Sequence, residues 1–145
     1  MKLVLQRVAF ASVTVEEKEI ARIGRGLLVL FGVEKGDDAD RLPYFVDKTV
    51  NLRIFPDDAG KMNLSCQDIN GEVLVVSQFT LAGDCKKGRR PGFDRAAPPD
   101  VAEKLYLRYV ELLKDSGVKV QNGKFAADMK VELLNDGPVT FILEN

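Results

Sequence analysis

The sequence contains no histidine. Catalytic arrangements that need an imidazole, such as the Ser-His-Asp triad and the Cys-His pair, are therefore excluded within this chain. Zinc sites with histidine ligands are excluded for the same reason, and two cysteines cannot form a structural zinc site alone. We expect no metal and no cofactor, so any chemistry must use backbone amides, hydroxyls, carboxylates, lysines or a group on the substrate.

Long apolar runs are also lacking. No stretch approaches the roughly 18 apolar residues that a membrane-spanning helix needs. The first residues, Met-Lys-Leu-Val-Leu-Gln-Arg, reach charge too early for a secretory signal peptide. Two cysteines, Cys66 and Cys85, in a chain without such a signal are typical of a reduced, cytoplasmic protein. We therefore expect a cytoplasmic location and no membrane partner.

The composition is that of an ordinary globular protein. The chain has 145 residues, of which 46% are hydrophobic and 30% charged, and we expect one domain spanning 1–145. The formal net charge of -1 argues against bulk capture of nucleic acid by a basic surface, so we expect no DNA partner. A local basic patch remains compatible with this charge.

The hydrophobic pattern predicts a mixture of strands and two helices. It predicts strands at 2–8, 13–15, 27–33, 51–55, 62–64, 74–81, 118–121, 125–134 and 138–143. Helical spacing predicts one helix over 42–50 and a second that opens at Pro98 and ends at Ser116. Asn122-Gly123 indicates a hairpin turn, and 135–137 indicates another turn. Because regular βαβ alternation is missing, we predict an α+β fold, with mixed or antiparallel sheets layered with two main helices.

Residues 74–81, Leu-Val-Val-Ser-Gln-Phe-Thr-Leu, are the stretch around which we expect the chain to be organised. The apolar run suits a buried strand that delivers Ser77, Gln78 and Thr80 to its end, where sites tend to form. The alternative is a strand that simply leaves the core, since strand ends are commonly polar. The hydroxyls of Ser77 and Thr80 are weak nucleophiles without a histidine base, whereas backbone amides near Phe79 and Thr80 would form an oxyanion hole without any particular side chain.

Two further stretches are candidates for the same site. The loop 82–100 carries a basic cluster, Lys86, Lys87, Arg89 and Arg90, which is either a solvated charge run or a phosphate-binding loop. The segment 135–140, Asn-Asp-Gly-Pro-Val-Thr, places Gly137-Pro138 at the entry to a strand, although proline cannot donate to a strand ladder. It is either a turn at a sheet edge or a rigid wall that exposes carbonyls to a ligand.

Ser77-Gln78-Phe79-Thr80-Leu81, together with the segment 135–140, resembles the signature pair of the D-aminoacyl-tRNA deacylases, also called D-tyrosyl-tRNA deacylases. The resemblance covers essentially the whole chain. Further matching motifs, in the expected order, are Gln6-Arg7-Val8, Gly26-Leu27-Leu28, Asn51-Leu52-Arg53, Lys87-Gly88-Arg89-Arg90-Pro91 and Ala127-Asp128-Met129.

The resemblance implies a homodimer that hydrolyses the ester joining a D-amino acid, or glycine, to the 3′-terminal adenosine of tRNA. It implies that Ser77, Gln78, Phe79 and Thr80 form the catalytic motif and that the RNA 2′-hydroxyl assists the attack. It also implies that a cis Gly137-Pro138 from the partner subunit rejects L-amino acids. The other residues it suggests are Arg7 and Asn135 at the Gly-Pro turn, Met129 at the adenine, and Lys86, Lys87, Arg89 and Arg90 on the tRNA.

Two positions depart from the family pattern, and one alternative function stays open. Ala126 and Gly92 stand where the resemblance predicts glycine and serine. The alternative to a proofreading hydrolase is a module that binds the aminoacyl-tRNA end without hydrolysing it, or an editing domain that acts in trans. A dimeric protein that binds small molecules is a third hypothesis, which predicts no dependence on RNA.

Overall fold

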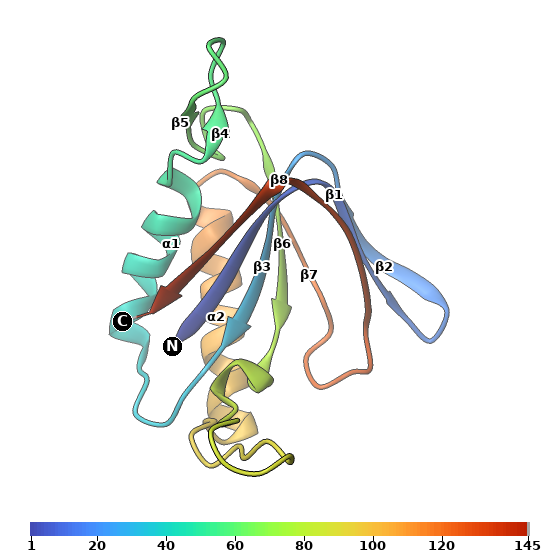
Figure 1. Cartoon of the computed structure of the whole chain (residues 1–145), viewed down its shortest axis with the longest axis vertical. Coiled ribbons are helices and arrows are strands. Elements are labelled where there is room, and N and C mark those ends of the chain that lie inside the picture. The colour runs from blue at the N-terminus through green and yellow to red at the C-terminus, as the bar shows by residue number, and fades with distance from the viewer. Residues whose placement is uncertain (145) are drawn as a thin grey trace.

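The computed structural model describes residues 1–144, and Figure 1 shows one twisted sheet with both long helices against one of its faces. The strands are β1 (Lys2–Val15), β2 (Lys18–Ile23), β3 (Gly26–Gly32), β4 (Phe55–Pro56), β5 (Met62–Leu64), β6 (Glu72–Ser77), β7 (Lys119–Asn122) and β8 (Lys130–Glu144). The helices are α1 (Leu42–Asn51) and α2 (Pro99–Asp115), with the short 3-10 helices η1 (Ala39–Arg41) and η2 (Phe79–Ala82). None of the described helices has both the length and the apolar character that crossing a membrane requires.

The main sheet is mixed. Its strand order is β2-β1-β3-β6-β7, and β8 pairs with β1 in addition. β3 runs parallel to β6, and β6 runs parallel to β7, while β1 is antiparallel to β2, β3 and β8. A mixed sheet with helices segregated to one face is an α+β fold, as the sequence predicts.

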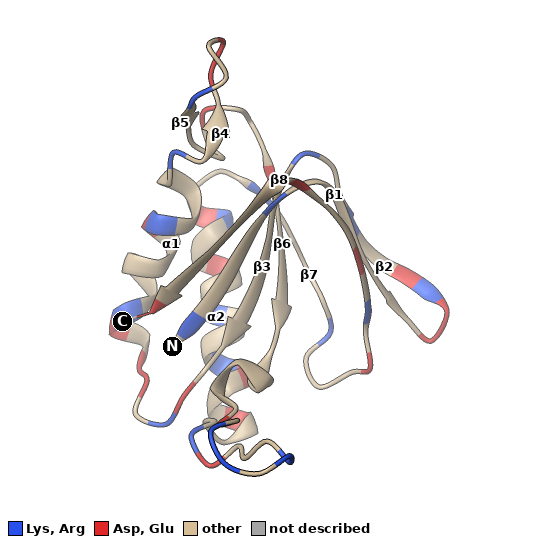
Figure 2. Ribbon diagram, in the orientation of Figure 1, with Lys and Arg blue, Asp and Glu red and all other residues tan. Residues whose placement is uncertain are grey.

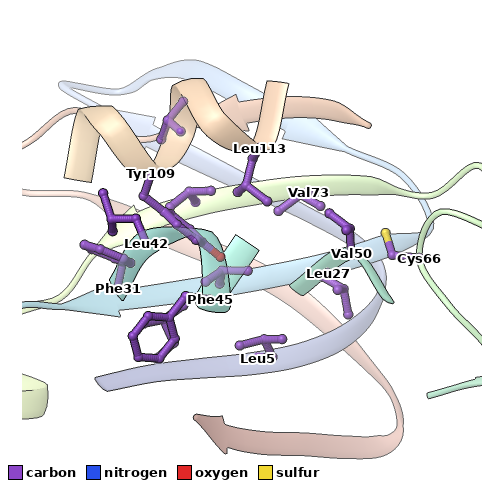
Figure 3. Close-up of a cluster of buried hydrophobic side chains, with 14 of the residues drawn as sticks. Leu5, Leu27, Phe31, Leu42, Phe45, Val50, Cys66, Val73, Tyr109 and Leu113 are labelled. Carbon is purple, nitrogen blue, oxygen red and sulfur yellow. The ribbon is translucent and has the colours of Figure 1, made fainter. Parts of the chain in front are cut away.

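Both faces of the central strands are buried, which explains their continuous apolar sequences. On one face, Leu27, Val29 and Phe31 of β3 pack with side chains of both helices, and Figure 3 shows Leu27 and Phe31 in this cluster. Tyr109 of α2 stacks on Phe31 with ring centroids 4.7 Å apart, and its hydroxyl contacts Thr49 of α1. On the other face, Leu28 packs with a second cluster from β1, β2 and β6. β3 is therefore the central strand that its sequence predicts.

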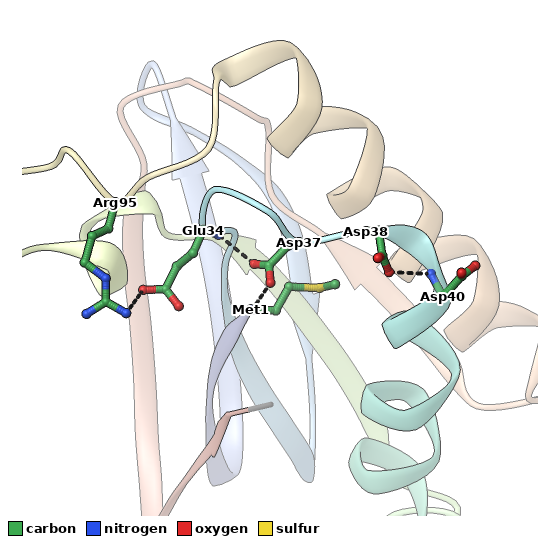
Figure 4. Close-up of polar contacts among 6 residues, drawn as sticks. All are labelled: Met1, Glu34, Asp37, Asp38, Asp40 and Arg95. Atoms are coloured by element: carbon green, nitrogen blue, oxygen red, sulfur yellow. Dashed lines mark hydrogen bonds and ion pairs between the residues drawn. The ribbon is translucent and has the colours of Figure 1, made fainter.

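The start of β1 is fixed by charge. The ammonium of Met1 is buried against the carboxylate of Asp37, which also accepts a 2.7 Å hydrogen bond from the Glu34 amide (Figure 4). One residue later, the side chain of Asp38 accepts from the Asp40 amide and caps η1. These contacts tie the first strand to the connection between β3 and α1.

Several sequence-based boundaries are wrong, each because a tertiary contact overrides a local signal. Asn122-Gly123 is not a hairpin turn, since β7 pairs in parallel with β6 and the Gly123 amide donates to Val75 O at 2.9 Å. Residues 135–137 do not separate two strands either, because β8 continues through them as an irregularity in its pairing with β1.

Three shorter stretches also differ from prediction. Residues 51–55 do not form a strand, since α1 includes Asn51 and only Phe55 and Pro56 are extended in β4. The predicted strand 74–81 ends at Ser77, and the chain then turns into η2. Residues 125–129 precede β8 as a loop. Asn145, the last residue of the predicted domain, lies outside the described residues.

Candidate active site

A cavity of about 740 Å³ lies at the carboxyl end of β6. Its lining includes four of the predicted site residues: Ser77, Gln78 and Phe79 at the end of β6, and Met129 just before β8. The remaining lining is mostly apolar and comes from β3, the loop 93–98, the start of α2 and the loop 125–129. The structure therefore brings together residues that are about 50 positions apart in the sequence around one concave surface.

The end of β6 is shaped by a change from strand to 3-10 helix. The Gln78 amide donates to Phe31 O at 2.8 Å, which extends the pairing with β3 by one residue beyond Ser77. The chain then enters η2, and the first amides of a helix have no partner within it. These are the amides of Phe79 and Thr80, for which the sequence predicts an oxyanion hole.

Thr80 occupies a different position from its three neighbours. It is exposed and lies outside the cavity lining formed by the described residues. Its hydroxyl accepts a 2.6 Å hydrogen bond from the side-chain amide of Gln78. This contact orients Gln78 and provides no base that would remove the hydroxyl proton.

The buried side chain of Tyr106 also lines the cavity, and sequence reasoning missed this role. Its hydroxyl lies 3.0 Å from Val75 O and 3.1 Å from Gly123 O, so it links β6 to the loop that follows β7. Burial raises the pKa of Tyr106 to about 12, and the phenol is neutral at physiological pH. The helical pattern predicts the helix that carries Tyr106, and nothing in the sequence shows which end of the core is hollow.

The loop 123–129 forms one wall of the cavity through two tight backbone features. The sulfur of Met129 lies close to the backbone of Gly123. A Cβ added at Gly123 would be only 2.6 Å from that sulfur, so a larger residue would not fit without a shift. Ala126 has a φ of 58°, a left-handed conformation that favours glycine. Alanine at this position therefore adopts a conformation that glycine would adopt with less strain. Gly92, the second departure, pairs with Asp84 within the basic loop.

The second predicted signature forms an exposed bulge on β8. The Gly137-Pro138 peptide is cis, and Gly137 has a φ of 143°. Arg7 of β1 is buried beneath it and donates from Nε to Asp136 O at 2.8 Å and from Nη1 to Ile54 O at 2.7 Å. Asn135 Oδ1 accepts from the Val139 amide at 2.8 Å, bridging the two sides of the bulge.

The bulge and the cavity do not meet within one chain. Ser77 pairs with Phe31 and Phe31 with Leu3, whereas the bulge lies opposite residues 6–8 of β1. At about 3.3 Å per residue, these positions are roughly 13 Å apart along the strand direction and are separated by β3 and β1. Within residues 1–144, none of the segment 135–140 lines the cavity.

The basic cluster occupies the tip of the loop between η2 and α2, at the bottom of Figure 2. Lys86, Lys87, Arg89 and Arg90 are all exposed. The loop is closed at its base, where the amides and carbonyls of Asp84 and Gly92 exchange hydrogen bonds of 2.8 and 2.9 Å. Between Gly92 and α2, the loop is held by a 2.9 Å ion pair between Arg95 and Glu34, drawn in Figure 4. The cluster is therefore presented on an anchored loop next to the cavity.

The thiols and carboxylates of the described residues provide no metal centre. Within residues 1–144, no group of three Cys, Asp or Glu side chains is placed to hold a metal ion. Cys66 and Cys85 are both free, and burial raises the pKa of Cys66 to about 12. The buried Cys66 thiol is therefore inert at neutral pH.

Comparisons with known proteins point to one family. The family model described as D-Tyr-tRNA(Tyr) deacylase matches residues 4–144. A D-aminoacyl-tRNA deacylase from Geotalea daltonii is 60% identical over 144 residues, which cover 99% of this chain and 96% of that protein.

Two solved structures share the fold. A c-Myc DNA unwinding element binding protein matches with a TM-score of 0.94 at 44% identity, covering 100% of this chain and 99% of that one. A probable eukaryotic D-amino acid tRNA deacylase matches with a TM-score of 0.85 at 20% identity, over 98% and 97% of the two chains. The second likeness shows the fold alone.

Proposed function

The chain belongs to the D-Tyr-tRNA(Tyr) deacylase family and is a hydrolase of the D-aminoacyl-tRNA ester bond, and from that premise we propose how its residues carry out this reaction. The substrate is a D-amino acid, or glycine, esterified to the 3′-terminal adenosine of tRNA. The biological role is proofreading, because the reaction frees tRNA that carries the wrong amino acid. The observation that carries the proposal is the cavity at Ser77, Gln78 and Phe79 beside an anchored basic loop.

The reaction is hydrolysis of an ester. The oxygen of water bonds to the carbonyl carbon, the bond between that carbon and the ribose oxygen breaks, and a proton returns to the ribose oxygen. The amides of Phe79 and Thr80 stabilise the negative charge that develops on the carbonyl oxygen. The 2′-hydroxyl of the terminal ribose assists the attack, because the chain has no histidine to act as the base.

The active enzyme is a homodimer in which each cavity is completed by the partner. In the described residues no strand pairs with the outer edge of β8, and this edge exposes Leu134, Phe141 and Ile142. Long unpaired edges with apolar side chains favour pairing with another chain. We place the two-fold axis at this edge, so that the bulge of one chain reaches the cavity of the other chain.

Gly137-Pro138 selects the chirality of the substrate. Its carbonyl oxygens would accept hydrogen bonds from the substrate amino group, so that an L side chain would collide with the bulge while a D side chain points away. Arg7 and Asn135 hold these carbonyls in place through the contacts at Asp136 O and the Val139 amide. Positioning to within about 1 Å is needed for such discrimination.

The remaining predicted residues contact the RNA. Met129 forms a wall for the adenine of the terminal nucleoside, next to Phe79. Lys86, Lys87, Arg89 and Arg90 contact phosphates, since exposed cations on one loop supply sequence-independent affinity. The compartment we propose is the cytoplasm, where the free thiols Cys66 and Cys85 remain reduced.

Hydrolysis of D-Tyr-tRNA and L-Tyr-tRNA, measured side by side with a chelator present, tests the proposal. A third substrate carries D-tyrosine on a terminal 2′-deoxyadenosine. We expect rapid loss of the D ester on normal tRNA, no loss of the L ester and slow loss of the deoxy ester.

Each alternative gives a different pattern in this assay. Equal hydrolysis of the deoxy ester would return the chemistry to a protein group, with Thr80 first to be examined. Protection of the D ester without turnover would identify a binding module. Equal loss of the D and L esters would remove the chiral role of Gly137-Pro138.

A further inference from the structure

We propose that an aromatic pair at the rim of the cavity, Phe79 and Phe93, is the stacking platform for the base that precedes the terminal adenosine of the substrate RNA. This inference rests on the proposed function and extends it by one nucleotide. It gives a role to Phe93, a residue that the sequence motifs leave without one.

The two rings form an exposed edge-to-face pair. Their centroids are 5.1 Å apart at an interplanar angle of 61°. Phe79 is 58% exposed and Phe93 is 39% exposed, whereas Phe31 and Tyr106 deeper in the same cavity are almost fully buried. An edge-to-face arrangement leaves ring surface open to a third flat group. The pair is therefore available to a nucleobase and contributes little to the core.

The position of Phe93 is fixed before any ligand binds. Its carbonyl accepts from the Ala96 amide at 3.0 Å, and the preceding residue, Gly92, is paired with Asp84. Gly83 provides the space for the ring, since an added Cβ there would lie 3.2 Å from Phe93 Cε1. A ring held in place in this way loses little conformational entropy on binding.

Charge and geometry together identify the occupant as single-stranded RNA. The terminal nucleoside must enter the cavity for its ester to reach Ser77 and Phe79, so the strand leaves across the rim. The loop that carries Phe93 also carries Lys86, Lys87, Arg89 and Arg90, which are suited to the phosphates on either side of the preceding nucleotide. Exposed aromatic rings beside a cationic loop are the features by which proteins bind single strands.

The test combines truncated substrates with a single variant. The substrates are D-tyrosyl-adenosine, D-tyrosyl-CpA and D-tyrosyl-CpA with an abasic site in place of the cytosine. For the wild-type chain we expect the cytosine to lower KM by about 5- to 150-fold, the range for stacking of one base on an aromatic side chain. Phe93→Leu should abolish most of this gain while kcat on D-tyrosyl-CpA changes little, and Phe93→Trp should restore it.

The matched control is Tyr44→Leu. Tyr44 is an exposed aromatic residue on α1 with Lys48 over its ring. Like Phe93, it is an exposed ring with cationic residues close to it in the chain, but it does not line the cavity. The cytosine should lower KM for this variant as much as for the wild type. Titration of unacylated CpA and of adenosine gives their dissociation constants, and the ratio of the two measures the contribution of the cytosine without turnover.

Three results would overturn the inference. If Phe93→Leu raised KM equally for all three substrates, Phe93 would be a wall of the cavity that holds the terminal nucleoside. An undiminished gain from the cytosine would remove the platform altogether. A shift of Phe93→Leu from dimer to monomer in sedimentation would show that the partner covers the ring. Failure of the wild-type chain to hydrolyse any substrate would instead contradict the proposed function, while the titration would still report on the platform.

Discussion

The end of β6 and the bulge on β8 are both exposed, yet they are built in opposite ways. At the end of β6, the chain turns into η2 and leaves amides without helical partners beside a cavity. At the bulge, a buried arginine and an asparagine satisfy the local backbone groups, and Gly137 and Pro138 remain exposed. The first region leaves backbone amides without helical partners, whereas side chains satisfy the backbone groups of the second. This difference is expected if each region serves the other only across a subunit boundary.

The largest expected effect comes from adding a methyl group to the bulge. In Gly137→Ala the new Cβ would lie 2.6 Å from Val139 Cγ2 and 3.0 Å from Arg7 Nη2, at a φ of 143° that disfavours any side chain. The bulge must shift, and a displacement of about 1 Å costs on the order of 100-fold in rate. We expect kcat/KM for D-Tyr-tRNA to fall by about that factor, with weakened discrimination against L-Tyr-tRNA.

A second glycine supplies the control for this prediction. Gly117 has a φ of 89°, and no atom lies within 4 Å of an added Cβ. Gly117→Ala carries the conformational cost without a collision and should leave kcat/KM unchanged. Unchanged rates and selectivity in Gly137→Ala would show that the bulge is not part of the site.

Removing the brace beneath the bulge should cost stability as well as activity. Arg7→Leu leaves the buried Ile54 carbonyl without its donor, and an unsatisfied buried group costs about 2 kcal/mol of unfolding free energy. Urea unfolding at fixed protein concentration measures this loss. Arg7→Lys keeps the charge and should lose less, whereas equal stability of the leucine variant would mean that the guanidinium does not support the bulge.

Substitutions on the cavity side should have smaller effects, because we propose that the basic loop acts through long-range charge. Arg89→Ala combined with Arg90→Ala should weaken tRNA binding about tenfold and flatten the slope of log K against log salt by about 1.4. The control, Lys18→Ala combined with Lys114→Ala, removes two exposed charges elsewhere. An identical salt slope for both double variants would show that the loop does not contact the phosphates of the tRNA.

The smallest effect is expected at Thr80. Its hydroxyl accepts from the Gln78 side chain and lies outside the described cavity lining, so Thr80→Ala should retain kcat within about fivefold, the cost of one neutral hydrogen bond. Loss of all turnover with intact tRNA binding would revive Thr80 as a nucleophile. It would also mean that the end of β6 supplies chemistry and not only charge stabilisation.

Local signals predict those parts of the fold where local and tertiary preferences agree. The apolar run at 27–33 predicts β3 because both of its faces are buried. The helix predicted to open at Pro98 begins at Pro99, because the missing N–H of proline is unneeded in the first turn. Asn122-Gly123 misleads because the decisive contacts, from the Gly123 amide and the Tyr106 hydroxyl to Val75 O, join residues far apart in sequence.

The same limit applies to the site. Ser77, Gln78 and Phe79 could be predicted from a strand end that turns polar, and the Gly-Pro pair from a proline at the entry to a strand. The resemblance to a known family added Met129. Tyr106 could not be found in this way, since a helical pattern gives the buried face without showing where the core is hollow. Phe93 could not be found either, because it lies in a loop that has no periodic pattern. That the bulge lies outside the cavity of its own chain depends on strand register, which no local motif encodes.

The bulge on β8 has a consequence for inheritance under the proposed assembly. A chain with a damaged bulge still carries a sound cavity, and a chain with a damaged cavity still carries a sound bulge. When these two chains form a dimer, one site contains both the defective bulge and the defective cavity, and the other site contains neither. Random pairing of two inactive alleles would thus restore about a quarter of the wild-type sites, so that each defective gene rescues the other.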